Sequence, residues 1–350
     1  MSALWNLPDF DAHEGVHLFH DIESGLRAVI AVHSTHLGPA AGGARYWHYA
    51  DPTAAVTDAL RLSRGMSYKN AMAGLPMGGG KAVLLADAPG AQKSDALLAA
   101  FGRAVDSLGG RYVTAEDVGM SDADMVKICR ETRHVAGLPV GDGAAGGDPG
   151  PFTAFGIYLG VCAAIRRALH KDSPHGVHIA IQGCGSVGGG LARRLAADGA
   201  RLTLSDVNAE RVGALAAELG AEIAAPDAIA SVAADVFSPN ALGAGLTEAS
   251  IAALQVPIVA GGANNQLATE ADGQRIHDRG ILFAPDYVIN AGGIINVALE
   301  YLGQGTRAEV EERIRCIPDR LEQVWEESAL TNRPASMVAD AMARQLIARG

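Results

Sequence analysis

The chain has 350 residues, more than one average domain needs, so we expect two domains that each bury a hydrophobic core. Apolar residues make up 49% of the sequence and the formal net charge is −11, which disfavours nucleic acids and acidic membranes as partners because both attract basic surfaces. Since no apolar run has the length of a membrane span and Met1–Asn6 lacks the pattern of a secretion signal, we expect a cytoplasmic protein that acts on small molecules.

The N-terminal part of the chain alternates between strand-like and helix-like segments. Leu26–Val32 is an apolar, β-branched run that predicts a strand, and Gly38-Pro39 predicts a turn. After Asp51-Pro52-Thr53 the apolar residues recur at helical spacing, so a helix is expected to run towards Lys69. The α/β pattern continues with a strand at Ala82–Leu85, a helix at Asp95–Leu108, and a strand at Tyr112–Thr114 that delivers Glu116 and Asp117.

Two lysines, Lys69 and Lys81, stand twelve residues apart, and three glycines, Gly78–Gly80, precede the second. A phosphate-binding loop would need a glycine at the position of Leu75 and a hydroxyl at that of Ala82, which excludes this interpretation. In a crowded cleft, burial and a second ammonium nearby would both lower the pKa of a lysine. The segment therefore predicts either a catalytic lysine or a tight turn with solvated lysines, and the pattern by itself leaves both open.

Residues 137–151 are too rich in glycine and proline for a regular element, so the domain boundary is expected there. Such a segment suits a linker and a hinge between closing domains equally well. We predict a substrate-binding and catalytic domain of residues 1–140 together with C-terminal helices 327–350. A nucleotide-binding domain of residues 141–326 and a cleft between the two domains complete this prediction.

A glycine motif in the second half indicates a dinucleotide site. The strand His178–Gln182 precedes a G-x-G-x-x-G turn, and the strand Leu202–Ser205 ends in Asp206. A carboxylate there binds ribose hydroxyls and repels a 2′-phosphate, which favours NAD over NADP, while Arg211 keeps NADP tolerance open. A glycine-rich turn without nucleotide is the alternative. The predicted cofactor contacts of the turn are Gly183, Cys184, Gly185, Ser186, Val187 and Gly188.

Further polar residues follow later strands of the predicted sheet. Ligands bind beyond the carboxyl ends of parallel strands, and the strands Val236-Phe237 and Pro257–Ala260 are each followed by asparagines. Asparagine is also a common turn residue, so these positions allow both interpretations. The predicted contacts are Asn240 and Asn264 for the cofactor, Asn265 for the substrate, and Thr153, at the start of a helix Thr153–Leu169, for the cofactor.

The C-terminal third is predicted to be mostly helical. Ala284–Gly293 reads as another glycine-bearing strand end that faces the cleft, before a helix that carries Ile294, Val297 and Leu299. Residues 307–350 follow a helical pattern with breaks at Pro318 and Pro334, and we expect this tail to pack on the first domain.

The cysteines and histidines do not indicate a metal site. No two cysteines form a C-x-x-C pair, and no histidine pair is followed by a carboxylate in a metalloprotease arrangement, so we expect buried thiols and no metal. The four cysteines are Cys129, Cys162, Cys184 and Cys316.

Five motifs in chain order resemble those of one enzyme family. They are Leu37–Arg45, Met66–Asn70, Gly78–Lys81, Thr114–Gly119 and Ala284–Gly293. Together they resemble the amino-acid dehydrogenases of the glutamate/leucine/phenylalanine/valine group, and the leucine dehydrogenases in particular. The likeness spans nearly the whole chain. It implies an α/β fold with an N-terminal substrate and oligomerisation domain, a Rossmann-type NAD-binding domain, and a homo-oligomer.

The resemblance also implies roles for three charged residues. Lys69 would bind the substrate α-carboxylate, Lys81 would be the catalytic base, and Asp117 would handle protons beside it. As a free amine, Lys81 would deprotonate a water that attacks an imine, and the products would be ammonia and a 2-oxo acid. Lowering a lysine pKa from about 10.4 to about 7.5 costs roughly 4 kcal/mol. Asp117 opposes that shift, so its own environment is expected to offset its charge.

Side-chain selectivity follows from the same comparison. Glutamate dehydrogenases carry a lysine at the position of Ala41, so glutamate is not the expected substrate, and leucine dehydrogenases usually carry leucine there. Ala41 widens the pocket, whereas Ile294 partly refills it, and one methylene changes discrimination by only about 1–3 kcal/mol. The predicted substrate contacts besides Lys69 are Ala41, Gly42, Ala115, Asn265, Ile294 and Val297.

We therefore expect an NAD-dependent L-amino acid dehydrogenase that deaminates leucine or another branched-chain amino acid. An aromatic substrate such as phenylalanine is the second expectation. A nucleotide-binding sensor without chemistry and a hydroxy-acid dehydrogenase are less consistent with the residues, because both lysines and Asp117 are present together and no histidine lies within the motifs.

Overall fold

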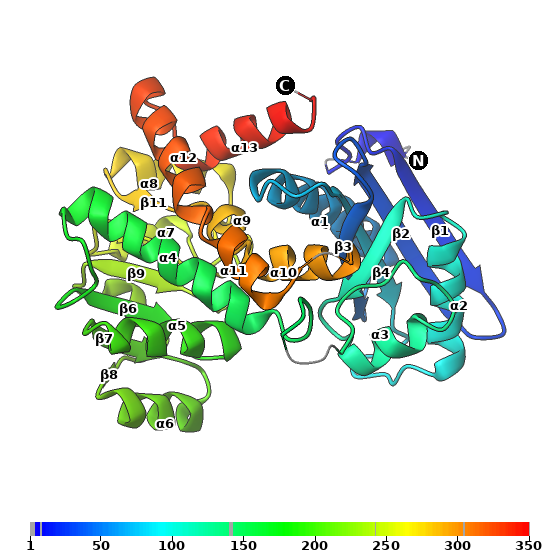
Figure 1. Cartoon of the computed structure of the whole chain (residues 1–350), viewed down its shortest axis with the longest axis horizontal. Coiled ribbons are helices and arrows are strands. Elements are labelled where there is room, and N and C mark those ends of the chain that lie inside the picture. The colour runs from blue at the N-terminus through cyan, green and yellow to red at the C-terminus, as the bar shows by residue number, and fades with distance from the viewer. Residues whose placement is uncertain (1–3, 8, 140–142, 242, 304, 350) are drawn as a thin grey trace. The chain divides into compact units, whose positions relative to one another are not determined.

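The computed structural model describes residues 4–7, 9–139, 143–241, 243–303 and 305–349 (Figure 1). The chain forms two compact units. Unit 1 consists of Met1–Asp148, Ile294–Val310 and Ala343–Gly350, and unit 2 consists of Pro149–Gly293 and Glu311–Met342.

These units divide the chain at other points than the domains expected from the sequence. The expected boundary between residues 140 and 141 lies outside the described residues, and unit 2 starts at Pro149. Most of the helical tail belongs to unit 2, because the indole Nε1 of Trp325 donates to the Phe283 carbonyl at 2.8 Å and the Tyr287 hydroxyl donates to Asp340 at 2.7 Å. Of the described tail, residues 307–310 and 343–349 belong to unit 1.

Unit 1 is built on a mixed five-stranded sheet in the order β1-β2-β4-β3-β5. β4 is central: it pairs antiparallel with β2 and parallel with β3. The elements of this segment are η1 Leu4–Asn6, β1 Gly15–Asp21, β2 Leu26–Ser34, β3 Ala40–Trp47, α1 Pro52–Met72, β4 Gly78–Leu85, α2 Asp95–Asp106, β5 Tyr112–Glu116 and α3 Asp122–Ile128.

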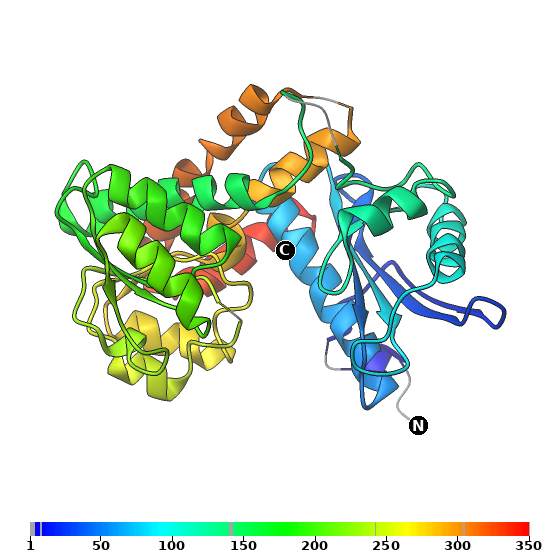
Figure 2. The same ribbon diagram turned by 90° about the horizontal axis from the view of Figure 1, so that it is seen from below.

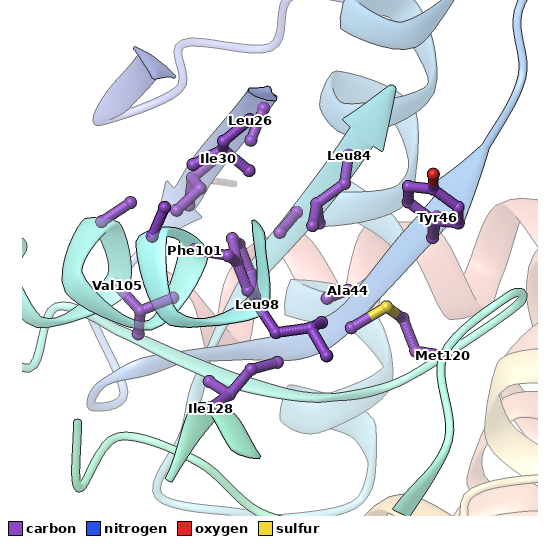
Figure 3. Close-up of a cluster of buried hydrophobic side chains, with 14 of the residues drawn as sticks. Leu26, Ile30, Ala44, Tyr46, Leu84, Leu98, Phe101, Val105, Met120 and Ile128 are labelled. Atoms are coloured by element: carbon purple, nitrogen blue, oxygen red, sulfur yellow. The ribbon is translucent and has the colours of Figure 1, made fainter. Parts of the chain in front are cut away.

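Helices cover both faces of this sheet. α1 packs on one face through Ala59 and Leu60, which meet Val29 and Val83 of the sheet. α2 and α3 cover the other face, as Figures 1 and 2 both show. The core under α2 and α3 is drawn in Figure 3, and its labelled residues are Leu26, Ile30, Ala44, Tyr46, Leu84, Leu98, Phe101, Val105, Met120 and Ile128.

Local sequence defines the start of α1 and its close packing on β4. Asp51 caps the helix by accepting from the Thr53 N–H, Pro52 occupies the first turn, and Lys69 lies in the last turn. Gly79 lies inside β4, and a Cβ on Gly79 would overlap the backbone of Ser67, so this glycine allows α1 to lie close to the strand. The glycine run is therefore part of the strand, whereas the sequence prediction placed the strand only after it.

Unit 2 contains a six-stranded parallel sheet in the order β11-β10-β9-β6-β7-β8. Counted along the chain from β6, this is the Rossmann order 3-2-1-4-5-6, and the order reverses between β6 and β9. From Gly150 onwards the elements are α4 Gly150–Leu169, β6 His178–Gln182, α5 Ser186–Ala197, β7 Arg201–Ser205, α6 Ala209–Leu219, β8 Glu222–Ile223, η2 Ile229–Ser231, β9 Val236–Pro239, α7 Glu248–Ala253, β10 Ile258–Val259, α8 Glu270–Asp278, β11 Leu282–Phe283, α9 Asp286–Ile289, α10 Gly292–Tyr301, α11 Arg307–Ile314, α12 Ile317–Thr331 and α13 Ala335–Leu346.

Three sequence expectations need correction in this part of the chain. Among the described helices, α4 is long and apolar enough to cross a membrane by length and composition, whereas the sequence analysis expected no such segment. In the structure, 56% of its most apolar window is buried, and the helix contacts α5, α12 and β10. The segment 137–151, expected to hold no regular element, overlaps this helix, because α4 already begins at Gly150. Ala284–Gly293 is not a strand end, because β11 ends at Phe283 and α9 follows.

The expectation of buried thiols is correct only for Cys184. Cys129 and Cys316 are exposed and Cys162 is partly exposed. Cys129 caps the C-terminus of α3 and Cys316 precedes α12, and helix ends of this kind lie at the surface.

A buried histidine ties the N-terminal segment of unit 1 to the residues at its C-terminal end. His33 Nδ1 lies 2.7 Å from Ser67 Oγ, and its Nε2 lies 2.8 Å from a guanidinium nitrogen of Arg349. The same guanidinium donates to the backbone carbonyls of Asp11, Ala12 and His33. Burial, together with the charge of Arg349, lowers the pKa of His33 from its ordinary 6.5 to about 3, despite the opposing carboxylate of Asp11.

This depressed pKa predicts acid sensitivity. Between pH 6.5 and about 3 the unfolded chain binds a proton at His33 that the folded chain does not, so stability is present above pH 6.5 and is lost as the pH falls. We expect the free energy of unfolding to fall by about 2 kcal/mol from His33 between pH 7.5 and pH 5. Urea unfolding at both values measures it. His33→Gln should show a smaller difference, and an equal difference would contradict the assignment.

Candidate active site

Lys81 is buried in the central strand of unit 1 and points at a carboxylate. Its residue exposure is 5%, and its Nζ donates to Asp117 Oδ2 at 2.8 Å. Asp117 follows the end of β5, as the sequence analysis predicted from the strand at Tyr112. The structure therefore brings together the two residues that were predicted to be catalytic.

A third charged residue, Arg45 of β3, completes this arrangement. Its Nε donates to the same Asp117 Oδ2 at 2.9 Å, and a terminal nitrogen donates to Asp58 of α1 at 3.1 Å. Asp58 also accepts from the Tyr49 hydroxyl at 2.7 Å. Sequence reasoning assigned no role to Arg45, although it closes the first family-like motif, and none to Asp58, which no motif contains.

Burial has the largest single effect on the pKa values of both Lys81 and Asp117. Loss of hydration lowers the pKa of Lys81, and the guanidinium of Arg45 adds to that shift, although Asp117 opposes it. Burial by itself would raise the pKa of Asp117, but Lys81 and Arg45 outweigh it and keep the carboxyl below its ordinary value. Arg45 thus places a cation beside the Lys81–Asp117 pair that the sequence analysis did not assign. Arg45 also supplies the expected offset of the Asp117 charge.

The predicted substrate contacts of unit 1 lie on the elements around this group. Ala41 of β3 pairs with Gly79 of β4, two positions before Lys81, and Ala41 and Ala115 are buried. Lys69 lies partly exposed in the last turn of α1, the helix that covers β4. Gly42 lies on β3, which is flanked by β4 and β5 in the sheet, and its carbonyl accepts from the Tyr112 hydroxyl at 2.6 Å.

Two further predicted contacts belong to the same unit and one does not. Ile294 and Val297 are partly exposed and one turn apart on α10, whereas their neighbours Ile295 and Ala298 are buried. They therefore share one open helix face. Asn265 belongs to unit 2.

Gly43 leaves the space that Asp117 fills. A Cβ on Gly43 would lie 2.6 Å from the Glu116 carbonyl oxygen and 2.8 Å from the Asp117 Cβ. We expect Gly43→Ala to displace the carboxylate from Lys81 and to lower kcat at least about tenfold, because small misplacements of a reacting group are costly. Steady-state rates measure the effect.

Gly65 of α1 provides the matched control, since a Cβ there would meet nothing within 4 Å. Gly65→Ala should keep full activity and stabilise the helix by up to about 1 kcal/mol. Equal rates for the two variants would show that Gly43 has no such role.

In unit 2 the glycine turn has the geometry of a pyrophosphate cradle. Gly183 has φ +88°, a conformation that favours glycine, and a Cβ on Gly188 would overlap the Gly183 carbonyl oxygen. A Cβ on Gly185 would meet no protein atom within 4 Å, so this backbone is open to an approaching group. α5 starts at Ser186 without a side-chain cap, which leaves its first N–H groups directed at that space.

Asp206 closes the predicted cofactor site at the end of β7. Its carboxylate accepts from the Cys184 N–H at 2.7 Å and from the Asn208 N–H at 2.8 Å, and Arg211 lies 3.5 Å away. The turn and the carboxylate are thus held to each other through Cys184, as a ribose site next to a pyrophosphate site requires.

The predicted asparagines follow β9 and β10. Asn240 accepts from the Gly262 N–H at 2.9 Å, so its side chain joins the loops that follow β9 and β10. Asn264 accepts from the side chain of Asn290 at 2.7 Å. Asn290 is 2% exposed, and its Oδ1 has no hydrogen-bond partner among the described residues, so it is ready for a ligand donor such as a carboxamide. The sequence analysis did not single it out.

The remaining predicted contact, Thr153, uses its hydroxyl to bond the Pro149 carbonyl at 2.9 Å in the first turn of α4. Among the described residues no group of three or more His, Cys, Asp or Glu side chains is placed to hold a metal ion.

Two family models match the chain. Residues 13–134 match the model described as Glu/Leu/Phe/Val dehydrogenase, dimerisation domain, and residues 208–348 match the model described as Glutamate/Leucine/Phenylalanine/Valine dehydrogenase. The chain belongs to the Glu/Leu/Phe/Val dehydrogenase family.

Individual members of the Glu/Leu/Phe/Val dehydrogenase family are similar over most of their length. Leucine dehydrogenase of Thermoactinomyces intermedius is 45% identical over 96% of this chain and 91% of its own, and valine dehydrogenase of Streptomyces coelicolor is 47% identical over 84% and 81%. The solved L-tryptophan dehydrogenase of Nostoc punctiforme superposes with a TM-score of 0.84 at 39% identity and covers 96% of each chain. The protein is thus an amino acid dehydrogenase, an oxidoreductase that acts on CH–NH2 groups, similar to leucine dehydrogenases.

The family models and the geometry support different parts of the site. The Lys81–Asp117 pair lies within the matched dimerisation domain, and Asn240, Asn264 and Asn290 lie within the second matched range. The glycine turn at residues 183–188 lies in neither range, so its assignment rests on the strand order and on the backbone geometry.

Proposed function

We propose that the protein catalyses the reversible, NAD-dependent oxidative deamination of a large apolar L-amino acid, leucine or another branched-chain one. The products are the 2-oxo acid, ammonia and NADH. The observation that carries the proposal is the buried Lys81, paired with Asp117 in a site whose burial favours its uncharged form.

The residues of unit 1 divide the work on the substrate. Lys69 binds the α-carboxylate as a cation, while Lys81 as a free amine takes a proton from the water that adds to the substrate imine. Asp117, 2.8 Å from Lys81, receives and returns protons as the adduct releases ammonia. A charged Lys81 could not act as the base, so the lowered pKa is part of the mechanism.

The residues of unit 2 are suited to hold NAD. The open backbone at Gly185, the carboxylate of Asp206 and the unpartnered oxygen of Asn290 fit a pyrophosphate, a ribose diol and a carboxamide respectively. NAD, when bound, accepts a hydride from the amino acid Cα. Asp206 supports NAD over NADP because its negative charge repels a 2′-phosphate.

An apolar lining supports an apolar substrate side chain. Ala41, Ala115, Ile294 and Val297 offer no charge that could bind the γ-carboxylate of glutamate. An aromatic amino acid is the second candidate, because both Ala41 and Ala115 are small and a similar solved structure is that of an L-tryptophan dehydrogenase.

Initial rates of NADH formation test the substrate class. We expect kcat/KM for leucine and valine to exceed that for phenylalanine and tryptophan by about tenfold or more, and glutamate to give no measurable rate. Alanine, which fills little of the pocket, is the matched control for apolar contact. The highest rate on glutamate would refute the pocket assignment, and the highest rate on an aromatic amino acid would favour the second candidate.

The match of residues 13–134 to a dimerisation domain supports a homo-oligomer as part of the proposal. Light scattering of the purified protein measures its mass, and a monomer at micromolar concentration would contradict it.

A further inference from the structure

We propose that Arg45 is a positioning residue that orients Asp117 and weakens the hold of this carboxylate on the Lys81 proton, and that Asp58 holds Arg45 in place. The inference rests on the proposed function of Lys81 as a base, and it assigns two residues that contact neither of the predicted ligands.

Lys81 and Arg45 share one carboxylate oxygen of Asp117. Lys81 Nζ at 2.8 Å and Arg45 Nε at 2.9 Å both donate to Oδ2 of Asp117. An oxygen that accepts from two cations is a weaker partner for each, so Arg45 reduces the pull of Asp117 on the Lys81 proton. The side chains of Lys81 and Arg45 are 6% and 21% exposed, which limits competition by water.

The second step is the restraint on Arg45 itself. Its guanidinium spans from Asp117 to Asp58, and Asp58 is fixed by three partners: Arg45 at 3.1 Å, Tyr49 at 2.7 Å and Arg61 at 3.0 Å. A guanidinium presents its donors in a rigid fork, so two anchored carboxylates define the direction of its Nε–H. Lysine could replace the charge of Arg45 but not this fork.

The third step is the charge balance at Lys81. Titratable or charged groups occur on each element packed around β4. They include Arg27 and His33 on β2, Arg45 on β3, Glu116 and Tyr112 on β5, Asp117 after β5, and Lys69 and Asp58 on α1. Burial has the largest effect on the pKa of Lys81 and lowers it; Asp117 and Asp58 raise it, and Arg45 lowers it. Removing Arg45 leaves Asp117 to hold the proton on Lys81 more tightly.

The test compares variants by the pH dependence of kcat/KM for amino acid oxidation, whose acidic limb follows deprotonation of Lys81. For Arg45→Met we expect this limb to move to higher pH by about one unit, with a loss in kcat at pH 8 of about tenfold or more. For Asp58→Asn we expect the acidic limb to move to lower pH, because this variant loses an anion and Arg45 then pairs more fully with Asp117. Arg45→Lys should keep the limb near that of the parent and lose kcat.

Arg103→Met is the matched control. Arg103 lies 58% exposed on α2 and pairs with Glu131 at 3.6 Å, so this variant should keep both the rate and the limb of the parent. Thermal unfolding of each variant identifies any that fail to fold, and Arg45→Lys remains informative if Arg45→Met does not fold.

A second readout does not depend on turnover. Competitive acetylation with acetic anhydride at a series of pH values, with mass spectrometry of the peptide that contains Lys81, measures its pKa in each variant. If the parent oxidises no amino acid, the proposed function fails while this measurement still decides the role of Arg45. An unchanged pKa of Lys81 in Arg45→Met would overturn the inference. A shift of that pKa in the same direction in Arg45→Met and Asp58→Asn would also overturn it.

Discussion

Lys81→Ala is expected to lower kcat by about 10³ to 10⁴-fold with every amino acid substrate, which is the upper range for the loss of a general base. The substitution removes the only group that donates to Asp117 from β4 in the described structure, while Arg45 remains bonded to that carboxylate at 2.9 Å. The site should therefore stay ordered without its base. Stopped assays with excess enzyme measure the residual rate.

Binding of NADH distinguishes loss of chemistry from loss of fold. Lys81 belongs to unit 1 and the glycine turn to unit 2, so fluorescence titration should give an unchanged Kd for NADH in Lys81→Ala. Lys127→Ala is the matched control, because that lysine is exposed and pairs with Asp95 at 2.7 Å. Turnover of Lys81→Ala within tenfold of the parent would refute the catalytic role.

Gly188→Ala is expected to weaken NADH binding by about 100-fold, or about 2.7 kcal/mol. A Cβ at this position would overlap the Gly183 carbonyl oxygen and come within 3.2 Å of the Asn240 Cβ. Both neighbours belong to the turn and the loop that we propose to bind the cofactor, and the added Cβ would force the start of α5 away from β6. Isothermal titration with NADH measures the loss.

Gly213→Ala in α6 is the control for this substitution, since a Cβ there would meet nothing within 4 Å. It should leave the Kd unchanged and stabilise its helix by up to about 1 kcal/mol. If Gly188→Ala binds NADH within threefold of the parent, the turn does not hold the pyrophosphate.

The sequence was informative where local pattern and burial agree. β2 is buried apart from Arg27 and is rich in valine and isoleucine, and β6 is buried up to Gln182 and contains two isoleucines. The Asp51-Pro52 start of α1 carries its own capping signal. β3, in contrast, has the sequence AAGGARYW, whose small residues have low strand propensity. It is a strand because β4 and β5 pair with it on both sides, which only the folded chain provides.

The same division holds for the site. Lys81 and Asp117 stand in motifs with glycines or at a strand end, so their sequence context could single them out, and the structure brings them together at 2.8 Å. Arg45 and Asp58 are joined by a bond between a strand and a helix, and in the sequence the charge of each looks like an ordinary surface charge. The distribution of the C-terminal helices between the units was likewise beyond local pattern, because contacts such as Trp325 with Phe283 join residues far apart in sequence.

The bonds of Arg349 to Asp11, Ala12 and His33 have a consequence for biosynthesis. A ribosome releases residues 343–349 after the rest of unit 1 and after all of unit 2. While the chain is being made, the N-terminal sheet can form, yet the guanidinium of Arg349 cannot reach His33 until residues 343–349 emerge. Completion of unit 1 therefore has to wait until residues 343–349 have been synthesised.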